Sequence, residues 1–129
     1  MTALLANQTA PVGEAVVAAW VERYVRAWET NDPSHIGALF AEHASYSPAP
    51  HEEPRRGRAA IVANWLGRKD EPGSWAFRHE VVAVAEDVAF VRGWTHYLDP
   101  PADYSNLWVI RFDPAGRCVE FTEWWMERP

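Results

Sequence analysis

Four alternating stretches in the second half of the chain constrain its fold most strongly. Residues 75–85, 88–98, 104–112 and 118–126 alternate apolar and polar side chains over the length of a strand, and short turn-forming segments separate them. Consecutive strands with short connections pair as antiparallel neighbours. This half of the chain therefore predicts a four-stranded antiparallel meander.

The first half carries helical periodicity instead. A first helix is predicted from apolar residues at steps of three and four: Val17, Trp20, Val21, Tyr24, Val25 and Trp28. Asp32 followed by Pro33 is typical of a helix start, and the helix that follows is expected to carry Ile36, Leu39 and Phe40.

Two further elements complete the predicted architecture. Residues 44–47 stop at Pro48 and are expected to form a short edge strand, and residues 48–56 are expected to form a loop. A third helix is predicted from Gly57 to Gly67. Three helices before a curved, mainly antiparallel sheet give an α+β domain whose helices pack on one face of the sheet and enclose a pocket. Residues 1–12 are interpreted as a flexible tail and residues 13–129 as a single domain.

Composition excludes several classes of function. The formal net charge of −6 disfavours nucleic acid as a partner, because binding to phosphates needs a basic face. No stretch of the sequence predicts a membrane span. Cys118 is the single cysteine, so no internal disulfide is expected and a cytoplasmic location is predicted. No pair of histidines has the close spacing of a zinc site, so no metal is expected.

The last predicted strand sets one carboxylate among aromatic rings. Phe121, Glu123 and Trp125 alternate with Thr122 and Trp124, so Glu123 shares a face with two rings. A carboxylate in apolar surroundings tends to have a raised pKa and becomes a candidate proton carrier, although structural ion pairs also perturb carboxylates. Alternation alone leaves open whether Glu123 or Trp124 faces the pocket, because a one-residue slip exchanges the two faces.

The turns of the meander decide which residues oppose one another. A tight turn at residues 86–87 would set His79 opposite Trp94. A next loop centred on Pro101 would set Trp94 opposite Trp108 and His96 opposite Asn106. One face is then expected to collect five side chains: His79, Trp94, His96, Asn106 and Trp108.

Four groups of residues in this order resemble the NTF2-like superfamily and, within it, the SnoaL-like group of polyketide cyclases and steroid isomerases. The groups are Glu22, Arg23, Tyr24, Val25, Ala27 and Trp28; Asp32, Ile36, Ala38, Leu39, Phe40 and Ala41; Arg56, Gly57, Arg58, Ala59, Ala60 and Ile61; and Arg111, Phe112, Asp113, Gly116 and Arg117. The resemblance implies a cone-shaped fold that encloses a pocket, and a homodimer packed through the sheets.

The resemblance also argues against steroid isomerisation. Tyr24 matches the tyrosine that such isomerases use to hold an oxyanion. Their aspartate base would fall near Ser47 and Pro48, and their second acid would fall at Trp108, so both acids are missing. The same alignment turns three residues of the last strand toward the pocket: Phe121, Glu123 and Trp125.

These residues define a candidate site. Glu123 and His96 are predicted to share a proton or hydrogen bond across Asn106 and to move protons as an acid and base pair. Tyr24 is predicted to donate a hydrogen bond to an oxyanion. Each residue has a structural alternative. Glu123 could form an ion pair with Arg92 or Arg78 or lie in solvent at the strand end, and His96 could donate to a neighbouring backbone group. His79 could lie in a dimer contact, and Tyr24 could be a core residue. The pocket is expected to be lined by Trp28, Tyr46, Trp65, His79, Trp94, Asn106, Trp108, Phe121 and Trp125.

Three functions fit this site. The first is a cofactor-free isomerase, cyclase or dehydratase that transfers protons on a small hydrophobic carbonyl compound. The second is a non-catalytic protein that binds such a molecule. The third is an association module that works through its sheet face.

Overall fold

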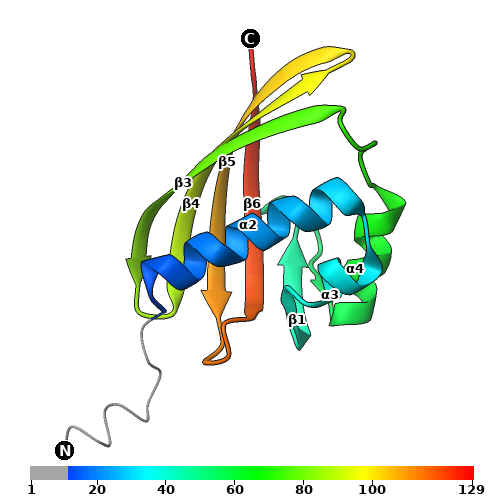
Figure 1. The fold of residues 1–129 in the computed structure, drawn as a ribbon. Helices are drawn as coiled ribbons and strands as arrows, with labels where there is room; N and C mark the ends of the chain where they lie inside the picture. The colour runs from blue at the N-terminus through cyan, green and yellow to red at the C-terminus, as the bar shows by residue number, and fades with distance from the viewer. Residues whose placement is uncertain (1–11) are drawn as a thin grey trace, which may run out of the picture.

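The computed structural model describes residues 12–129, which form three helices on one side of a curved sheet (Figure 1). The helices are α2 (Glu14–Thr30), α3 (Pro33–Gly37) and α4 (Arg58–Gly67). The strands are β1 (Phe40–Ser47), β2 (Arg55–Arg56), β3 (Trp75–Ala85), β4 (Val88–Leu98), β5 (Pro101–Phe112) and β6 (Cys118–Arg128). The predicted α+β class, with helices packed on a curved sheet, is confirmed.

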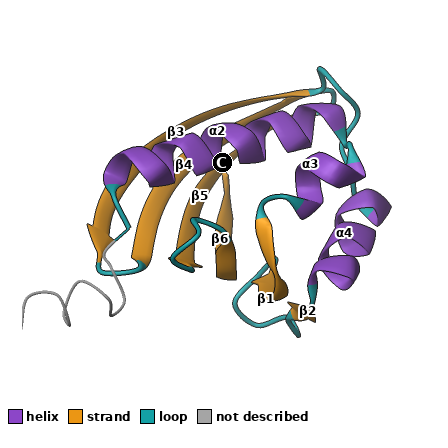
Figure 2. Cartoon of the chain, turned by 60° about the horizontal axis from the view of Figure 1, so that its bottom comes forward, coloured by secondary structure: helices purple, strands orange, loops and turns teal. Residues whose placement is uncertain are grey.

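The six strands form one sheet in the order β2-β1-β6-β5-β4-β3. Strand β1 runs parallel to β6, and every other neighbouring pair is antiparallel. In Figure 2 the sheet arches over helix α2, while α3 and α4 lie toward the β1 side. The concave face therefore looks onto the helices, and the convex face is free of them.

Helix α2 supplies the centre of the core. Its buried residues are Val17, Trp20, Val21, Tyr24 and Ala27. The Trp20 indole Nε1 donates a hydrogen bond of 2.9 Å to the main-chain oxygen of Leu39, so burial of this ring leaves no unpaired donor. The helix ends at Thr30, and its capping residue Asn31 has a left-handed φ of 54°. Of the predicted tail, residues 1–12, all but Val12 lie outside the described residues. Val12 packs on the core, and its N–H donates a hydrogen bond to the main-chain oxygen of Glu86.

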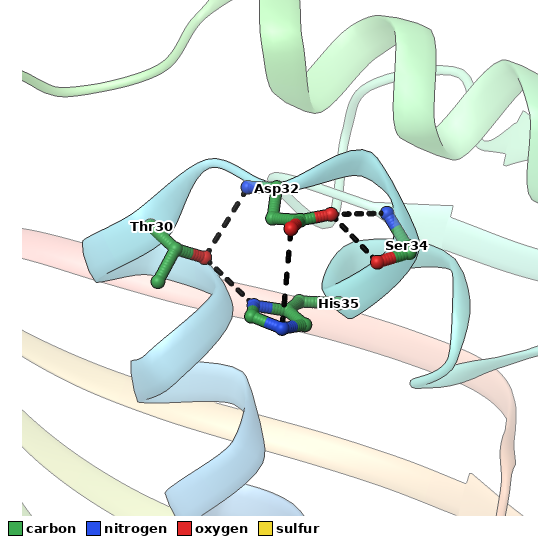
Figure 3. A network of polar contacts seen from close by, with 4 residues as sticks. All are labelled: Thr30, Asp32, Ser34 and His35. Atoms are coloured by element: carbon green, nitrogen blue, oxygen red, sulfur yellow. Dashed lines mark hydrogen bonds and ion pairs between the residues drawn. The ribbon is translucent and has the colours of Figure 1, made fainter.

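Helix α3 begins where Asp32 predicts it but is shorter than expected. The Asp32 carboxylate accepts hydrogen bonds from the N–H and hydroxyl of Ser34 (Figure 3). The His35 ring contacts the Thr30 hydroxyl through Nδ1 and the Asp32 carboxylate through Nε2. These contacts satisfy the first turn of the helix. The prediction that Leu39 and Phe40 are helical is wrong, because the Leu39 carbonyl accepts from the Cys118 N–H and Phe40 starts β1.

Strand β1 is not an edge strand, contrary to the prediction. It starts at Phe40 and is paired on both sides, with β2 and with β6. The short strand β2, within the segment predicted to be a loop, covers the edge. Tyr46 pairs with Phe121 of β6 and is thereby placed at the centre of the domain.

A bulge in β3 displaces the predicted pairing of β3 with β4. The turn at residues 86–87 is tight, because Ala85 pairs with Val88. The register then shifts between Val81 and Ala83, which leaves Val82 as the extra residue. Beyond the bulge His79 pairs with Gly93, so the prediction that His79 opposes Trp94 is wrong.

The connection from β4 to β5 is also shorter than predicted. Leu98 pairs directly with Pro101, so the turn holds Asp99 and Pro100 and is not centred on Pro101. As a result Trp94 pairs with Ser105, and the predicted pairing of Trp94 with Trp108 is wrong. Likewise His96 pairs with Asp103 and not with Asn106.

Strands β5 and β6 set the register that the sequence leaves open. Asp113 and Gly116 close the turn between them, and Gly116 takes a φ of 82°. A bulge follows on β6, after which Trp108 pairs with Glu123. Glu123 therefore shares the concave face with Trp108, and Trp124 points to the convex face with Leu107.

Candidate functional site

A cavity of about 400 Å³ lies between the helices and the concave face of the sheet. Helices α2 and α4, the segments that follow β1 and α4, and strands β1 and β3 to β6 all contribute to it. Its lining combines nine aromatic residues with eight polar or charged ones. The aromatic lining residues are Tyr24, Trp28, Tyr46, Trp65, Phe77, Tyr97, Tyr104, Trp108 and Trp125. This combination is typical of a site for a small organic molecule.

Glu123 is the acid at the sheet side of the cavity. Its Oε2 accepts a hydrogen bond of 2.7 Å from Asn106 Nδ2 and one of 3.1 Å from Trp108 Nε1. Both donors belong to β5, the strand that pairs with β6. Among the described residues, Glu123 forms no ion pair and its Oε1 accepts no hydrogen bond, so the predicted alternative of a bridge to Arg92 or Arg78 is not what the structure holds.

Burial raises the pKa of Glu123 from 4.5 to about 7, although the hydrogen bonds from Trp108 and Asn106 act in the opposite direction. The group can therefore hold or release a proton near neutral pH, as a general acid or base requires.

A second layer of contacts orients the amide of Asn106. Thr95 Oγ1 on β4 donates a hydrogen bond of 2.8 Å to Asn106 Oδ1, and both side chains are buried. Because the amide oxygen is occupied by Thr95, the Nδ2 group is turned to Glu123. The polar row from Thr95 through Asn106 to Glu123 crosses three adjacent strands.

Two tyrosines face the same cavity and keep their protons. Burial raises the pKa of Tyr24 well above 10.0, and the neighbouring Tyr46 and Glu123 add to the effect. The pKa of Tyr46 is also raised, chiefly by burial. Hydroxyl groups that stay protonated can donate hydrogen bonds to a ligand oxygen.

The ring of Phe77 on β3 lies directly over Gly93 on β4. A Cβ atom on Gly93 would lie 2.5 Å from two ring atoms of Phe77, so any larger residue there would force the ring to move. The Phe77 ring stacks on Trp108 with centroids 5.2 Å apart. Gly93 thus allows Phe77 to lie flat beneath the Trp108 indole and to line the cavity.

The structure brings most of the predicted site residues together. The cavity is lined by Tyr24, Trp28, Tyr46, Trp65, Asn106, Trp108, Glu123 and Trp125. Phe121 is fully buried behind the lining and stacks on Tyr24 and Tyr46. Trp125 lies at the mouth, with half of its surface exposed.

Three predicted site residues lie elsewhere. His79 is on the concave face but outside the cavity lining, with its Nε2 3.3 Å from Glu22 Oε1 on α2. Trp94 is on the convex face under the guanidinium groups of Arg78 and Arg92. His96 is also convex, and its Nδ1 lies 2.7 Å from Asp103 Oδ1. The predicted proton-sharing pair of His96 with Glu123 is therefore wrong, because the short turn after Leu98 moves His96 away from Asn106.

Several cavity residues escaped the sequence interpretation. Thr95, Tyr97 and Tyr104 were not predicted because the turn between β4 and β5 is shorter than expected, which changes the residues that face the cavity. Asp70 lies in the segment after α4, where no periodicity predicts the direction of a side chain. Its Oδ2 accepts hydrogen bonds from Trp28 Nε1 at 3.0 Å and from the Tyr97 hydroxyl at 3.3 Å.

Within residues 12–129, no cluster of three or more histidine, cysteine or acidic side chains could hold a metal ion. In the same part of the chain, no helix has both the length and the apolar character needed to cross a membrane.

A sequence profile of the SnoaL-like domain matches residues 21–124, which include all of the cavity-lining strands up to Trp124. The chain belongs to the SnoaL-like family. The match contains Glu123 and the hydrogen-bond donors that hold it.

Solved structures share the SnoaL-like fold. A ketosteroid isomerase-like protein from Erwinia carotovora atroseptica has a TM-score of 0.66 at 21% identity, over 90% of this chain and 97% of that one. An NTF2-like protein of unknown function from Mesorhizobium loti has a TM-score of 0.65 at 23% identity, over 88% and 93% of the two chains. The epoxide hydrolase/cyclase-like enzyme SalBIII, described in pyran ring formation in the polyether salinomycin, has a TM-score of 0.67 at 18% identity, over 84% and 89%.

Proposed function

We propose that this SnoaL-like chain is a cofactor-free enzyme that transfers protons on a small hydrophobic carbonyl compound, in an isomerisation, cyclisation or dehydration. One observation carries the proposal: the Glu123 carboxyl group, with a pKa of about 7, faces an aromatic cavity of about 400 Å³. A group that titrates near neutral pH is equally able to take up and to deliver a proton.

The simplest step uses Glu123 as a base. The ionised carboxylate removes a proton from the carbon next to the substrate carbonyl, and the C–H electrons move into an enolate. The hydroxyl of Tyr24 donates a hydrogen bond to the enolate oxygen. The carboxylic acid then returns its proton to another atom of the same substrate, so the enzyme ends in its starting state.

The position of Glu123 supports chemistry distinct from that of steroid isomerases. By the resemblance, steroid isomerases have their second acid at the position that Trp108 occupies in this chain. The Trp108 indole donates a hydrogen bond to a carboxyl group on the neighbouring strand. The acid is therefore supplied by β6 in place of β5. SalBIII, an epoxide hydrolase/cyclase-like enzyme of the same fold, has a role in pyran ring formation, which makes cyclisation one of the reactions to test here.

A non-catalytic binding protein is the second candidate. It is favoured by the position of His96 on the convex face, since the cavity lining within residues 12–129 includes no histidine that could pair with Glu123. A binding protein needs the aromatic walls but does not need a carboxyl group that titrates near pH 7.

Deuterium exchange distinguishes the two candidates. The probe is 2-tetralone, a bicyclic ketone with acidic C–H bonds next to its carbonyl. We expect the protein to accelerate incorporation of deuterium from D₂O at these carbons, measured by proton NMR. Glu123→Gln should lose the acceleration, because the amide cannot act as the base, while it retains binding of the ketone. The matched control is Glu120→Gln, since Glu120 is exposed on the same strand. Equal exchange rates for wild type and Glu123→Gln would remove Glu123 from the mechanism.

We also propose a homodimer formed through the convex face of the sheet. Leu107, Trp124 and Met126 are exposed apolar residues there, on the adjacent strands β5 and β6. Such a patch on the helix-free face favours association. Trp124→Glu should convert a dimer into a monomer in sedimentation velocity, whereas Val16→Glu, an exposed position on α2, should not. A wild-type monomer at micromolar concentration would contradict this proposal.

A further inference from the structure

Besides Glu123 and Glu52, Asp70 brings a carboxylate to the cavity, from the segment that follows α4. Three contacts fix it in place. Its Oδ2 accepts hydrogen bonds from Trp28 Nε1 at 3.0 Å and from the Tyr97 hydroxyl at 3.3 Å. Its main-chain oxygen accepts one of 3.1 Å from Asn31 Nδ2. Side chains from α2, from the residue that caps α2 and from β4 therefore hold one aspartate on the cavity wall.

The other oxygen of Asp70 has no partner. Among residues 12–129, Oδ1 accepts no hydrogen bond and no lysine, arginine or histidine forms an ion pair with Asp70. The nearest basic residues in the sequence do not serve it: Arg68 lies 3.9 Å from Glu52, and Lys69 forms no ion pair. A carboxylate oxygen only accepts hydrogen bonds, so Oδ1 of Asp70 can bind a hydrogen-bond donor of a ligand.

We propose that Asp70 recognises a hydroxyl group of the substrate, with its free Oδ1 accepting the hydroxyl hydrogen while the substrate carbonyl lies at Tyr24 and Glu123. This inference rests on the proposed function and narrows its substrate class from hydrophobic ketones to hydrophobic hydroxyketones. Among residues 12–129, no hydrogen bond joins the contacts of Asp70 to those of Glu123, so each carboxyl group is free to bind a different part of a ligand.

A neutral donor fits this site better than an ammonium group. Both groups that already bind Asp70 Oδ2, an indole N–H and a phenol O–H, are neutral. Arg68 and Lys69 also line the cavity, and their positive charges oppose the entry of a cationic ligand. A hydroxyl group meets the free oxygen without that repulsion.

The contacts of Asp70 predict a specific result for Asp70→Asn. Trp28 Nε1 is a donor only, so the amide oxygen must take the place of Oδ2. The amide NH₂ group then replaces the free Oδ1 and presents a donor to the cavity. The substitution is therefore expected to turn a site that prefers a donor into a site that prefers an acceptor.

Two probes test this: 6-hydroxy-2-tetralone, which offers a donor, and 6-methoxy-2-tetralone, which offers only an acceptor. Dissociation constants are measured by quenching of tryptophan fluorescence. Wild type should bind the hydroxy compound about tenfold more tightly, in line with a hydrogen bond to a charged group. Asp70→Asn should abolish or reverse that preference. Glu71→Gln, at an exposed neighbouring position outside the cavity lining, should keep it.

The outcomes separate this inference from the proposed function. Equal binding of the two probes by wild type, or an unchanged preference in Asp70→Asn, would overturn hydroxyl recognition by Asp70 and leave proton transfer by Glu123 standing. Glu123→Gln should keep the hydroxyl preference while it loses deuterium exchange. Failure of wild type to bind either probe would overturn both proposals.

Discussion

Trp108 and Glu123 face each other across β5 and β6, and the indole Nε1 donates a hydrogen bond of 3.1 Å to the carboxyl oxygen Oε2. The pair combines two opposing influences on one acid. The apolar surroundings disfavour the charged form, whereas the hydrogen bond favours it. Their balance keeps the pKa of Glu123 at about 7.

Trp108→Phe should raise the pKa of Glu123 above 7, because it removes one donor to the ionised form and keeps most of the apolar ring. We expect the ionised fraction at pH 7 to fall about fivefold. NMR of the ¹³C-labelled glutamate carboxyl group measures the titration. Trp20→Phe is the matched control, since it also removes a buried indole donor but one bound to Leu39. A titration that stays unchanged in Trp108→Phe would show that the hydrogen bond does not set the pKa.

The stability of the protein should fall as Glu123 ionises. Its pKa is about 7 in the folded state and 4.5 as the unperturbed value, so the folded state binds the proton more tightly. The associated stability is fully present below pH 4.5 and is lost as the pH rises through 7. Relative to Glu123→Gln, wild type should lose about 3 kcal/mol between pH 4 and pH 8. Urea unfolding at the two pH values measures this difference.

The control for this pH dependence is Glu120→Gln, which removes an exposed carboxylate of the same strand. Its difference from wild type should vary little over the same range. A free-energy difference between wild type and Glu123→Gln that is independent of pH would contradict a raised pKa.

Thr95→Val should weaken the row of side chains that orients Asn106. The substitution removes the 2.8 Å hydrogen bond to Asn106 Oδ1 and leaves a buried acceptor unpaired, at a cost of about 1–3 kcal/mol of unfolding free energy. With the amide free to turn, the pKa of Glu123 should also rise. Thr122→Val is the control, because Thr122 lies on the convex face and its side chain forms no hydrogen bond among the described residues. Equal effects of the two substitutions would argue against an orienting role for Thr95.

Gly93→Ala should destabilise the domain and disturb the cavity wall. The added methyl group would lie 2.5 Å from the Phe77 ring, which is confined by its stacking on Trp108. We expect a loss of about 1–3 kcal/mol in thermal or urea unfolding. In a Phe77→Leu background, which lacks the clashing ring atoms, the same substitution should cost at least about 1 kcal/mol less. Additive effects of the two substitutions would place the strain elsewhere.

Local signals predicted the elements of this fold well. The helical stripe through Trp20 and Tyr24, the cap at Asp32 and the alternation in the last four strands all correspond to the observed elements. Each of these signals depends on residues close together in the sequence. The boundaries of β3 and β4 follow for the same reason, since the tight turn at residues 86–87 fixes both.

The site was harder to predict from the sequence than the elements, because it depends on the register of pairing across several strands. Glu123 could be proposed from its own strand, whose alternation sets it among rings. The prediction for His96 is wrong because the turn can be centred at different positions between Asp99 and Pro101, and alternation does not determine which one is used. The bulge at Val82 has no local signature that distinguishes it from a regular strand residue. Asp70 is held by side chains far from it in the sequence, so its position follows only from the folded chain.

The two donors to Glu123 both occupy Oε2, and this arrangement has a stereochemical consequence. A proton carried by the carboxyl group is directed to Oε1, the oxygen that faces neither Asn106 nor Trp108. Delivery from one fixed oxygen in a rigid cavity reaches only one face of a planar enolate. The product of such a reaction would carry a single configuration at the protonated carbon, so chirality would be set by two hydrogen bonds on the far side of the acid.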